Sequence, residues 1–473
     1  MAVAGPTPRP SRRAFLAGVA AVAGLAGCAP AVTGGRPVPV PVDPVLASGA
    51  RRPNLLIIVS DDHRWDHMSC VPNHPPFLRT PALDQLAARG TLGANAFVTT
   101  ALCSPSRASF LSGEYASRHG VMNNLTPWNP QTQTFFEQLM AAGYDNAFIG
   151  KWHMPGAVPD LRGVDRFITF TAEEGQGKYI DCPLLIDGVM TPRPDTYIST
   201  DLTDLAIEWI DERPNDKPWC LWLAHKAVHH QWIPPADLAG SLNGVDFSNL
   251  PPESFALLGA LDRNIWEGSV GSMYALYQRY CETLMGLDRE IGRLINRVDQ
   301  RGETDSTFVV YTSDNGYSWG EHVLTGKRWA YEENTRVPFL VAGPGIGMGT
   351  TDKLLLNVDL APTVLEWGRA AELPAAQGRS LVNVLTGAND LWRRDFLYQY
   401  FPDFPYNVPG ISAARDEQWL YITYARGLAP QLFDVRADPL TQMDLIDAEP
   451  AVARRMQQRL GELESTVASG GIV

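Results

Sequence analysis

The chain has 473 residues, which is long enough for one large α/β domain and a smaller second domain. A hydrophobic share of 45% is that of an ordinary globular protein, and six cysteines are too few for a disulfide-stapled scaffold. The net charge of −13 and the pI of about 5.2 argue against nucleic acid as a main partner. If the protein binds an anion, the positive charge must therefore be local to the site.

The N-terminus shows the features of an export signal in the expected order. A twin-arginine motif precedes an apolar run over residues 14–26, which is too short to span a bilayer. The sequence Leu25-Ala26-Gly27-Cys28 then resembles a lipobox, in which Cys28 carries the lipid. We therefore predict a twin-arginine lipoprotein signal over residues 1–28 and a flexible tether over residues 29–53. The chain would be exported and lipid-anchored on the outer side of the bacterial cytoplasmic membrane or in the periplasm, with no other membrane contact.

A pair of acidic residues follows the first predicted strand. Residues 54–59 form a continuous apolar run with β-branched side chains, which is typical of a buried parallel strand. The run is followed by Asp61 and Asp62, and ligand sites in open α/β sheets lie beyond the carboxyl ends of the strands. Two adjacent carboxylates there would repel each other unless a cation is bound. The alternative is a solvated turn that caps a helix.

A candidate nucleophile lies at the start of a predicted helix. In the sequence Cys103-Ser104-Pro105-Ser106-Arg107, the proline fits the first turn of a helix that continues over residues 108–115. Cys103 then lies where free backbone N–H groups favour an anion. Arg107 points back to the same place with a forked donor. The alternative is a buried cysteine before an ordinary helix.

Lysine and histidine side chains follow two further predicted strands. The strand over residues 145–149 is followed by Lys151 and His153, which would project to one side, although a surface lysine and a core histidine are the alternative. The strand over residues 219–224 runs into a segment with three histidines, His225, His229 and His230. A zinc site of the HExxH type is not indicated, because the glutamate spacing is absent.

A second set of polar side chains follows the predicted strand over residues 307–312. Asp314 and Asn315 follow the end of a buried strand, as Asp61 and Asp62 do, so the four side chains together would form an all-oxygen site. Such a site suits a hard cation such as Ca²⁺ or Mg²⁺ rather than zinc or copper. Lys327 follows in a Gly-Lys-Arg sequence, and its alternative is a solvated side chain.

The remaining predicted elements complete an α/β fold with a large mixed, mostly parallel sheet sandwiched by helices. We expect helices over residues 81–90, 134–143, 200–211, 269–298 and 357–367, a strand over residues 97–100 that leads into Cys103, and loops near the pocket mouth over residues 155–194. Gly90 should cap the first of these helices, and His119 is expected to be structural. Short alternating strands at 419–424 and 431–434, with a helix near 451–465, predict a smaller antiparallel sheet packed by one helix. The predicted boundaries are 54–385 for the main domain and 386–473 for the C-terminal subdomain.

The motifs together resemble the formylglycine-dependent type I sulfatases of the alkaline-phosphatase-like superfamily. The resemblance rests on Cys-x-Pro-x-Arg at 103–107, Gly-Lys-Trp-His at 150–153, Ser-Asp-Asn-Gly at 313–316 and the acidic pair. It implies that a formylglycine-generating enzyme converts Cys103 to formylglycine, whose hydrated aldehyde is the nucleophile. It also implies that Asp61, Asp62, residue 103, Asp314 and Asn315 bind Ca²⁺, with Mg²⁺ or Mn²⁺ as alternatives.

The same resemblance implies roles for the basic residues. Arg107, Lys151 and Lys327 would bind the sulfate, and His153 would assist the loss of sulfate from the covalent intermediate. His229 would protonate the departing alcohol. His230 is the alternative, because both histidines lie in a predicted loop, where the alignment with the family's histidine is ambiguous. Asp314 would help the attack as a base.

The expected reaction is hydrolysis of a sulfate ester, for instance of a sulfated carbohydrate, to an alcohol and inorganic sulfate. One alternative is a phosphonate or phosphate ester hydrolase of the same superfamily. Another is a non-catalytic, lipid-anchored binding protein. Aryl and alkyl sulfates stay open as substrates, as do endo or exo action, the oligomeric state and the pairing of Cys70, Cys182, Cys220 and Cys281.

Overall fold

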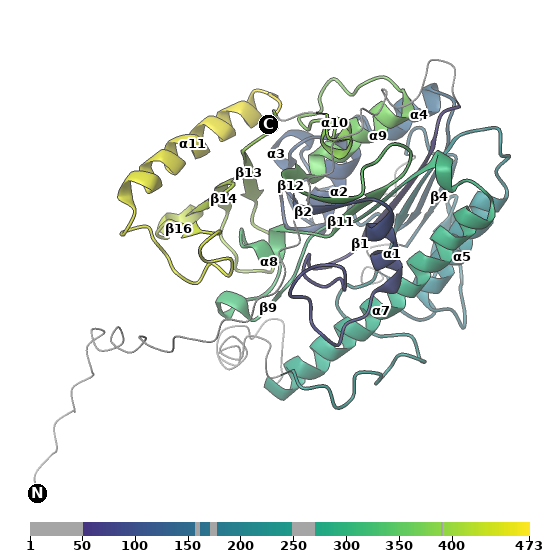
Figure 1. The fold of residues 1–473 in the computed structure, drawn as a ribbon, viewed down its shortest axis with the longest axis horizontal. Helices are drawn as coiled ribbons and strands as arrows, with labels where there is room; N and C mark the ends of the chain where they lie inside the picture. Colours follow the sequence, from purple (N-terminus) through teal and green to yellow (C-terminus); the bar gives the residue numbers. More distant parts are fainter. Residues whose placement is uncertain (1–50, 157–160, 171–176, 248–269, 389–390) are drawn as a thin grey trace, which may run out of the picture. The chain divides into compact units, whose positions relative to one another are not determined.

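The computed structural model describes residues 51–156, 161–170, 177–247, 270–388 and 391–473 (Figure 1). The predicted export signal and residues 29–50 of the predicted tether lie outside the described residues. Within the described part, none of the helices combines the length and apolar character needed to cross a bilayer. Cys70, Cys220 and Cys281 are free thiols.

A ten-stranded sheet forms the centre of the fold, with the strand order β12-β2-β11-β8-β1-β7-β3-β4-β5-β6. Strands β8, β1, β7, β3 and β4 are mutually parallel, whereas β11 and β5 run antiparallel to their neighbours. This confirms the predicted mixed, mostly parallel sheet. The strands are β1 Asn54–Ser60, β2 Thr91–Phe97, β3 Asp145–Gly150, β4 Arg166–Thr169, β5 Leu184–Ile186, β6 Val189–Thr191, β7 Trp219–Ala224, β8 Thr307–Ser313, β11 Phe339–Ala342 and β12 Gly349–Leu356.

Helices cover both faces of this sheet because the central strands are apolar on both sides. In β1, Leu55, Ile57 and Val59 pack into one hydrophobic cluster, and Leu56 and Ile58 pack into the other. The first cluster includes side chains of α2 Cys103–Ser112, α4 Phe135–Ala141 and α9 Leu360–Gly368. The second includes side chains of α1 Pro81–Arg89, α5 Ile198–Asp211 and α7 Val270–Gln300. The sheet is thereby sandwiched between two helical layers (Figure 1).

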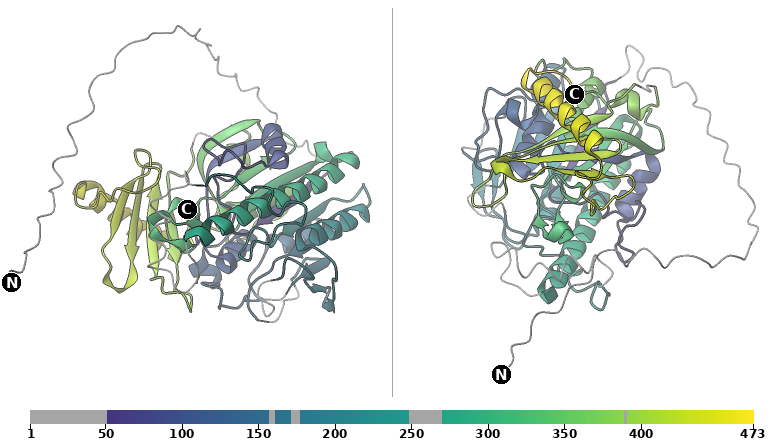
Figure 2. Two further views of the ribbon diagram at one scale, coloured as in Figure 1. Left: turned by 90° about the horizontal axis from the view of Figure 1, so that it is seen from below. Right: turned by 90° about the vertical axis from the view of Figure 1, so that its left-hand side faces the viewer.

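A separate four-stranded antiparallel sheet follows in the C-terminal part, as predicted. It contains β13 Asp395–Tyr400, β14 Ile411–Asp416, β15 Trp419–Tyr424 and β16 Gln431–Asp434. Helix α11, Pro450–Ala468, lies across this sheet and buries Leu460 and Leu463 against it (Figure 2). Strand β13 is tied to the segment that follows β2, since the backbone N–H of Gln399 donates to the carbonyl of Thr99 over 2.9 Å.

The remaining elements are short. They are helices α3 Ala116–His119, α8 Glu332–Thr335 and α10 Val382–Leu385, and a two-stranded sheet of β9 Ser318–Trp319 and β10 Thr325–Gly326.

Three local predictions were wrong. Strand β2 ends at Phe97, where the predicted strand begins, because the next residues bond to α8 instead, as in the Val98 N–H to Thr335 carbonyl bond of 2.8 Å. Helix α2 has Pro105 in its first turn as predicted, but it ends at Ser112 rather than at residue 115, because Gly113 adopts a left-handed φ of 73°. The segment 155–194, predicted as loops, contributes three short strands at the edge of the main sheet. Side chains there such as Val189 and Met190 are exposed, so no clear alternation marks those strands.

Gly90 ends α1 as predicted, but for a different reason than a left-handed cap. Its φ is −152°, which any residue can adopt. A Cβ atom at this position would lie 2.0 Å from the carbonyl oxygen of Val341. Glycine is therefore required by the close approach of β11 to the end of α1.

His119 is structural, as predicted. Its ring is 4% exposed, Nε2 lies 3.1 Å from the Ser109 hydroxyl, and Nδ1 accepts a hydrogen bond from the Val121 N–H over 3.1 Å. Burial lowers the pKa of His119 from its ordinary value near 6.5 to about 3. The ring is therefore neutral, with Nε2–H as the donor to Ser109.

The depressed pKa of His119 predicts a loss of stability in mild acid. Below pH 6.5 the unfolded chain binds a proton on this ring that the folded state excludes, so stability falls as the pH decreases toward 3. Because of this ring, the free energy of unfolding should be about 2 kcal/mol lower at pH 5 than at pH 7.5. Urea unfolding at both pH values should show a smaller pH dependence for His119→Gln than for the natural chain. An unchanged pH dependence in the variant would contradict the assignment.

Candidate active site

The central parallel strands end at one edge of the sheet, and each is followed by residues with reactive or charged side chains. The sequence-predicted residues at these ends are Asp61 and Asp62 after β1, Asp314 and Asn315 after β8, Lys151 and His153 after β3, and His225 and His229 after β7. Helix α2 brings Cys103 and Arg107 to the same edge, and the segment after β10 brings Lys327. All of them are buried except His229, which is partly exposed.

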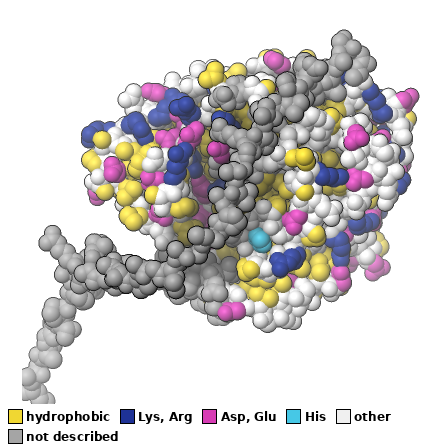
Figure 3. Space-filling model, viewed as in Figure 1, with side chains coloured by type: hydrophobic (Ala, Val, Ile, Leu, Met, Phe, Trp, Pro, Cys, Tyr) yellow, Lys and Arg dark blue, Asp and Glu magenta, His cyan; other side chains and the backbone are white. Residues whose placement is uncertain are grey.

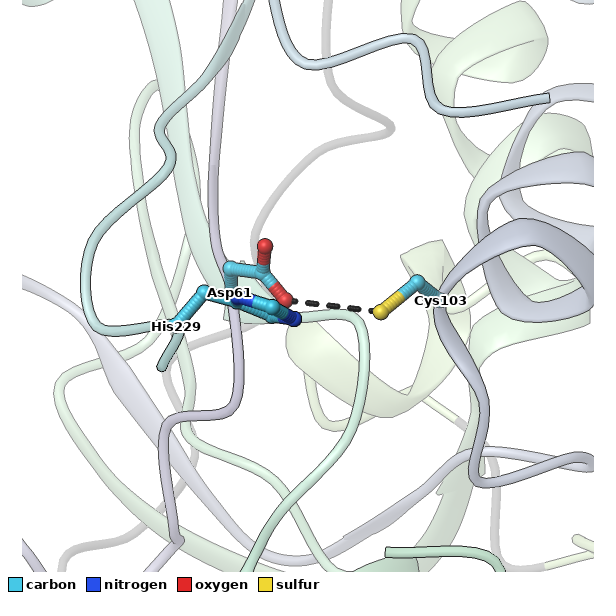
Figure 4. A group of neighbouring side chains, drawn as sticks. All are labelled: Asp61, Cys103 and His229. Atoms are coloured by element: carbon cyan, nitrogen blue, oxygen red, sulfur yellow. Dashed lines mark hydrogen bonds between the residues drawn. The ribbon is translucent and has the colours of Figure 1, made fainter. Parts of the chain in front are cut away.

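Cys103 lies at the centre of this group. It is the first residue of α2 and projects toward Asp61, with the ring of His229 beside the same carboxylate (Figure 4). Its Sγ lies 2.7 Å from Lys327 Nζ, 3.6 Å from Lys151 Nζ and 3.6 Å from Asp61 Oδ1. Burial raises the pKa of the thiol to about 12 despite the two lysines. An unmodified Cys103 is therefore a neutral thiol and a poor nucleophile.

Each of three carboxylates is paired with a basic side chain. Lys151 Nζ contacts Asp61, and Lys327 Nζ lies 2.6 Å from Asp62 Oδ1. The Arg107 guanidinium donates to Asp314 Oδ2 from Nε over 2.9 Å and lies 2.7 Å from it through Nη2. Three acidic and three basic groups therefore neutralise one another in this cluster.

The donor set fits a hard divalent cation. Ligand atoms of Asp61, Asp62, Cys103 and Asp314 all lie within 4.8 Å of one another. Burial raises the pKa of Asp62, with Asp61 adding to the shift, and burial also raises the pKa of Asp314. The side-chain oxygen of Asn315 is buried and has no hydrogen-bond partner among the described residues. A cation at this point would satisfy that oxygen and offset the repulsion between the carboxylates.

The histidines of this region differ in their surroundings. His229 Nε2 lies 3.9 Å from Asp62 Oδ2, whereas His230 is exposed and packs edge-on against Trp232. The His153 carbonyl accepts a hydrogen bond from the Ser104 hydroxyl over 2.6 Å, which ties the end of β3 to α2. Burial lowers the pKa of both His153 and His229, with Lys151 adding to the shift, so both rings are neutral here. His225 is fully buried.

Asp314 is less suited to the predicted role of a base. Its Oδ1 accepts a hydrogen bond from the Asp62 N–H over 3.2 Å, and its Oδ2 is occupied by Arg107. Both oxygens are therefore already in use in this structure.

Lys226 was missed from the sequence, although it is the second residue after β7. Its ammonium lies 5.1 Å from the centre of the Tyr179 ring, and the Tyr179 hydroxyl donates to the His229 carbonyl over 2.8 Å. Burial lowers the pKa of Lys226 to about 8, with Lys151 adding to the shift. The only signal in the sequence was its position between two histidines at a strand end.

The charge that an anionic ligand needs lies inside the site rather than on the visible surface. Lys and Arg side chains are interspersed with Asp and Glu on the face shown in Figure 3, in keeping with a net charge of −13. Lys151, Lys327 and Arg107 are by contrast at most 6% exposed. Any anion attracted by them must enter the site itself, which favours a small charged group over an extended polyanion.

The model of the sulfatase family matches residues 53–370 of the chain, which is more than half of its length. The chain belongs to the sulfatase family. A second family model, described as the C-terminal part of N-sulphoglucosamine sulphohydrolase, matches residues 320–466. This sulfatase is therefore a sulfuric ester hydrolase, and the alternative of a non-catalytic binding protein is without support. The buried cluster at Asp61, Asp62, Cys103 and Asp314 is compatible with the divalent metal that the family generally uses.

Several known proteins that this chain resembles are sulfatases named for glucosamine substrates. The chain is 28% identical to the N-acetylglucosamine-6-O-sulfatase of Bacteroides thetaiotaomicron, with 88% of this chain and 86% of that protein covered. It is 29% identical to human N-acetylglucosamine-6-sulfatase, with 78% and 72% covered. A solved structure in complex with its substrate, D-glucosamine-2-N,6-O-disulfate, superposes with a TM-score of 0.79 at 26% identity, over 89% of this chain and 99% of that one. These likenesses establish the alkaline-phosphatase-like sulfatase fold.

Proposed function

We propose that this sulfatase removes the 6-O-sulfate group of a glucosamine or N-acetylglucosamine residue. The observation that carries the proposal is the placement of both lysine ammonium groups, Lys151 and Lys327, against Cys103 Sγ. A sulfate group bound between them would present its sulfur to position 103, and its oxygens would accept hydrogen bonds from the two lysines. The choice of sugar and position rests on the substrates named for the similar proteins.

The nucleophile in this proposal is formylglycine at position 103, made from the cysteine by a formylglycine-generating enzyme. One hydroxyl of the hydrated aldehyde loses its proton and forms a bond to sulfur, while the bond from sulfur to the sugar oxygen breaks. That oxygen takes up a proton. The second hydroxyl then loses its proton, the aldehyde double bond forms, and the bond to sulfate breaks. Addition of water to the aldehyde restores the hydrate.

The surrounding residues hold and neutralise the reacting group. Asp61, Asp62, Asp314 and Asn315, together with residue 103, would hold Ca²⁺, for which Mg²⁺ or Mn²⁺ are alternatives. When bound, the cation would supply positive charge to the sulfate oxygens. We assign His229, whose Nε2 lies 3.9 Å from Asp62 Oδ2, to the proton of the departing sugar oxygen, and His153 to the release of sulfate. Both rings are neutral without substrate, so His229 would take up this proton only after the anionic sulfate ester has entered the site.

The proposal is tested by sulfate release from a panel of esters. Protein from a host that makes formylglycine is incubated with glucosamine 6-sulfate, N-acetylglucosamine 6-sulfate, the 3-sulfate isomers, 4-nitrophenyl sulfate and choline sulfate, with Cys103→Ala as the blank. The 6-sulfated sugars should give the largest kcat/KM. Faster cleavage of a phosphonate monoester than of any sulfate would instead favour the phosphonate hydrolase alternative. The phosphonate monoester hydrolase of Agrobacterium radiobacter has the same fold, with a TM-score of 0.72 at 22% identity.

We further propose that the protein is exported by its twin-arginine signal and anchored through a lipid on Cys28. Support comes from the order of charge, apolar run and lipobox in the sequence. In the native host, the natural chain should be recovered with membranes and should incorporate labelled fatty acid, whereas Cys28→Ala should do neither. Incorporation of the label by the variant would refute the anchor.

A further inference from the structure

A buried ion pair lies directly beside the catalytic lysine. Arg328 follows Lys327 in the chain, and its Nη2 donates to Asp403 Oδ2 over 2.9 Å. Arg328 is 4% exposed and Asp403 is 2% exposed. Asp403 belongs to the loop between β13 and β14, so the pair joins the small sheet to the active-site edge of the large one.

The pair is incompletely satisfied. Asp403 Oδ1 and Arg328 Nε are both buried without a hydrogen-bond partner among the described residues. An unsatisfied buried polar atom costs about 1–3 kcal/mol, and more when the group is charged. Arg328 also has a φ of +98°, a conformation that is strained for a residue with a side chain.

The position of the pair connects it to the reacting centre. The Tyr398 hydroxyl donates to the Arg328 carbonyl over 2.7 Å and accepts from the Ala101 N–H over 3.4 Å, two residues before Cys103. The Lys327 side chain, one residue before Arg328, reaches Cys103 Sγ. The loop of Asp403 is also held at its other side, since Asn123 Nδ2 donates to the Pro402 carbonyl over 2.9 Å.

A partly exposed aromatic ring packs against the pair, and a second exposed aromatic side chain is next to Asp403 in the chain. The Arg328 guanidinium carbon lies 3.4 Å from the centre of the Tyr406 ring, and Tyr406 is 37% exposed. Phe404 is 81% exposed. A carboxylate, a guanidinium and exposed aromatic rings form a set that matches a sugar, whose hydroxyls donate and accept hydrogen bonds and whose C–H face is apolar.

We propose that Asp403 and Arg328 bind two neighbouring hydroxyl groups of the sugar ring that carries the sulfate. One hydroxyl donates to Asp403 Oδ1, and the oxygen of the other accepts from Arg328 Nε. The pair thereby selects hexosamine sulfates over sulfates without a sugar. This inference rests on the proposed function, because it assigns the sugar-binding part of the same site.

The test compares a sugar ester with an aryl ester in one isosteric variant. Asp403→Asn keeps the shape of the side chain but loses the charge. On glucosamine 6-sulfate its kcat/KM should fall about 10- to 100-fold, mainly through KM, and the fall on 4-nitrophenyl sulfate should be at least about 10-fold smaller. Equal falls on both esters, or no fall on the sugar, would overturn the proposal.

The Glu332–Arg415 pair provides a matched control. It is buried, also joins the small sheet to the rest of the chain, and has a 2.7 Å contact between Arg415 Nη2 and Glu332 Oε1. Glu332→Gln should lower the Tm and leave the ratio of the two kcat/KM values unchanged. If Asp403→Asn lowered only the Tm, with an unchanged ratio, the pair would be structural and the proposal wrong.

Monodeoxy analogues of glucosamine 6-sulfate keep the test valid if the variant folds poorly. With the natural protein, the analogue that lacks the bound hydroxyl should lose about as much kcat/KM as the variant loses on the full sugar. On that analogue, the kcat/KM of Asp403→Asn should be close to that of the natural protein, because the contact is already absent. Full activity of the natural protein on every deoxy analogue would refute the hydroxyl contacts. If the natural protein released sulfate from 4-nitrophenyl sulfate but from no glucosamine sulfate, the proposed function itself would fail.

Discussion

Replacing Cys103 with serine is expected to abolish multiple turnover, with a loss in kcat of at least about 1,000-fold, or about 4 kcal/mol. A serine hydroxyl held between Lys151 and Lys327 can still attack sulfur, but the resulting ester has no neighbouring hydroxyl that could collapse and expel sulfate. The enzyme should stop after one turnover. Steady-state sulfate release measures the loss, and intact-mass analysis should find one sulfate group on position 103.

The control for this prediction is Cys220→Ser. Cys220 is also fully buried, but it lies near the start of β7, at the opposite end of the strand from the site. Its replacement should cost stability and leave kcat close to that of the natural enzyme. A hydrazide probe should label an aldehyde in the natural protein and in Cys220→Ser but not in Cys103→Ser. Near-natural multiple turnover by Cys103→Ser would refute the formylglycine mechanism.

The central part of the fold was predictable because its strands can be recognised from their own residues. The strands β1, β7 and β8 are buried on both faces, so each is a continuous apolar run with a sharp polar end. Since parallel strands end at the same edge, the polar residues after them had to lie together. The predicted meeting of Asp61 and Asp62 with Asp314 and Asn315 follows from this rule.

Other parts depend on contacts between distant segments and could not be predicted. Strands β5 and β6 have three residues each, and their pairing at the sheet edge rather than any apolar pattern makes them strands. The Arg328–Asp403 pair joins positions 75 residues apart, one in the segment after β10 and the other in the loop between β13 and β14. Nothing local marks Asp403, which the sequence places in an ordinary proline-containing loop.

The charge balance of the site explains how an acidic protein can bind an anion. Asp61, Asp62 and Asp314 offset Lys151, Lys327 and Arg107, so the cluster is neutral without a metal. A divalent cation would leave an excess of two positive charges inside a buried site. This buried positive charge is unfavourable until an anion enters and neutralises it. It attracts the anion at short range, so the protein does not need a basic surface. The metal is therefore expected to control substrate binding as well as the reaction.

Removal of divalent cations is accordingly expected to reduce kcat/KM on a sulfate ester at least about 100-fold, or by nearly 3 kcal/mol. Without the cation the lysines stay paired with the carboxylates, as Lys327 is with Asp62 at 2.6 Å. Protein treated with a chelator should regain activity when Ca²⁺ is added. Independently of activity, Ca²⁺ at about 100 times its Kd should raise the Tm by about 3–5 °C, because it binds only the folded state.

Two aspartate variants determine whether the cation binds where the donor set indicates. Asp62→Asn should lose most of the Ca²⁺-dependent rise in Tm, because it removes one charge from the cluster. Asp299→Asn removes an exposed carboxylate, which lies 3.2 Å from Arg89 outside the site, and it should show the full rise. An equal Ca²⁺ response in both variants would place the metal elsewhere. Full activity after chelation would instead mean that the lysines and Arg107 alone supply the charge for the reaction.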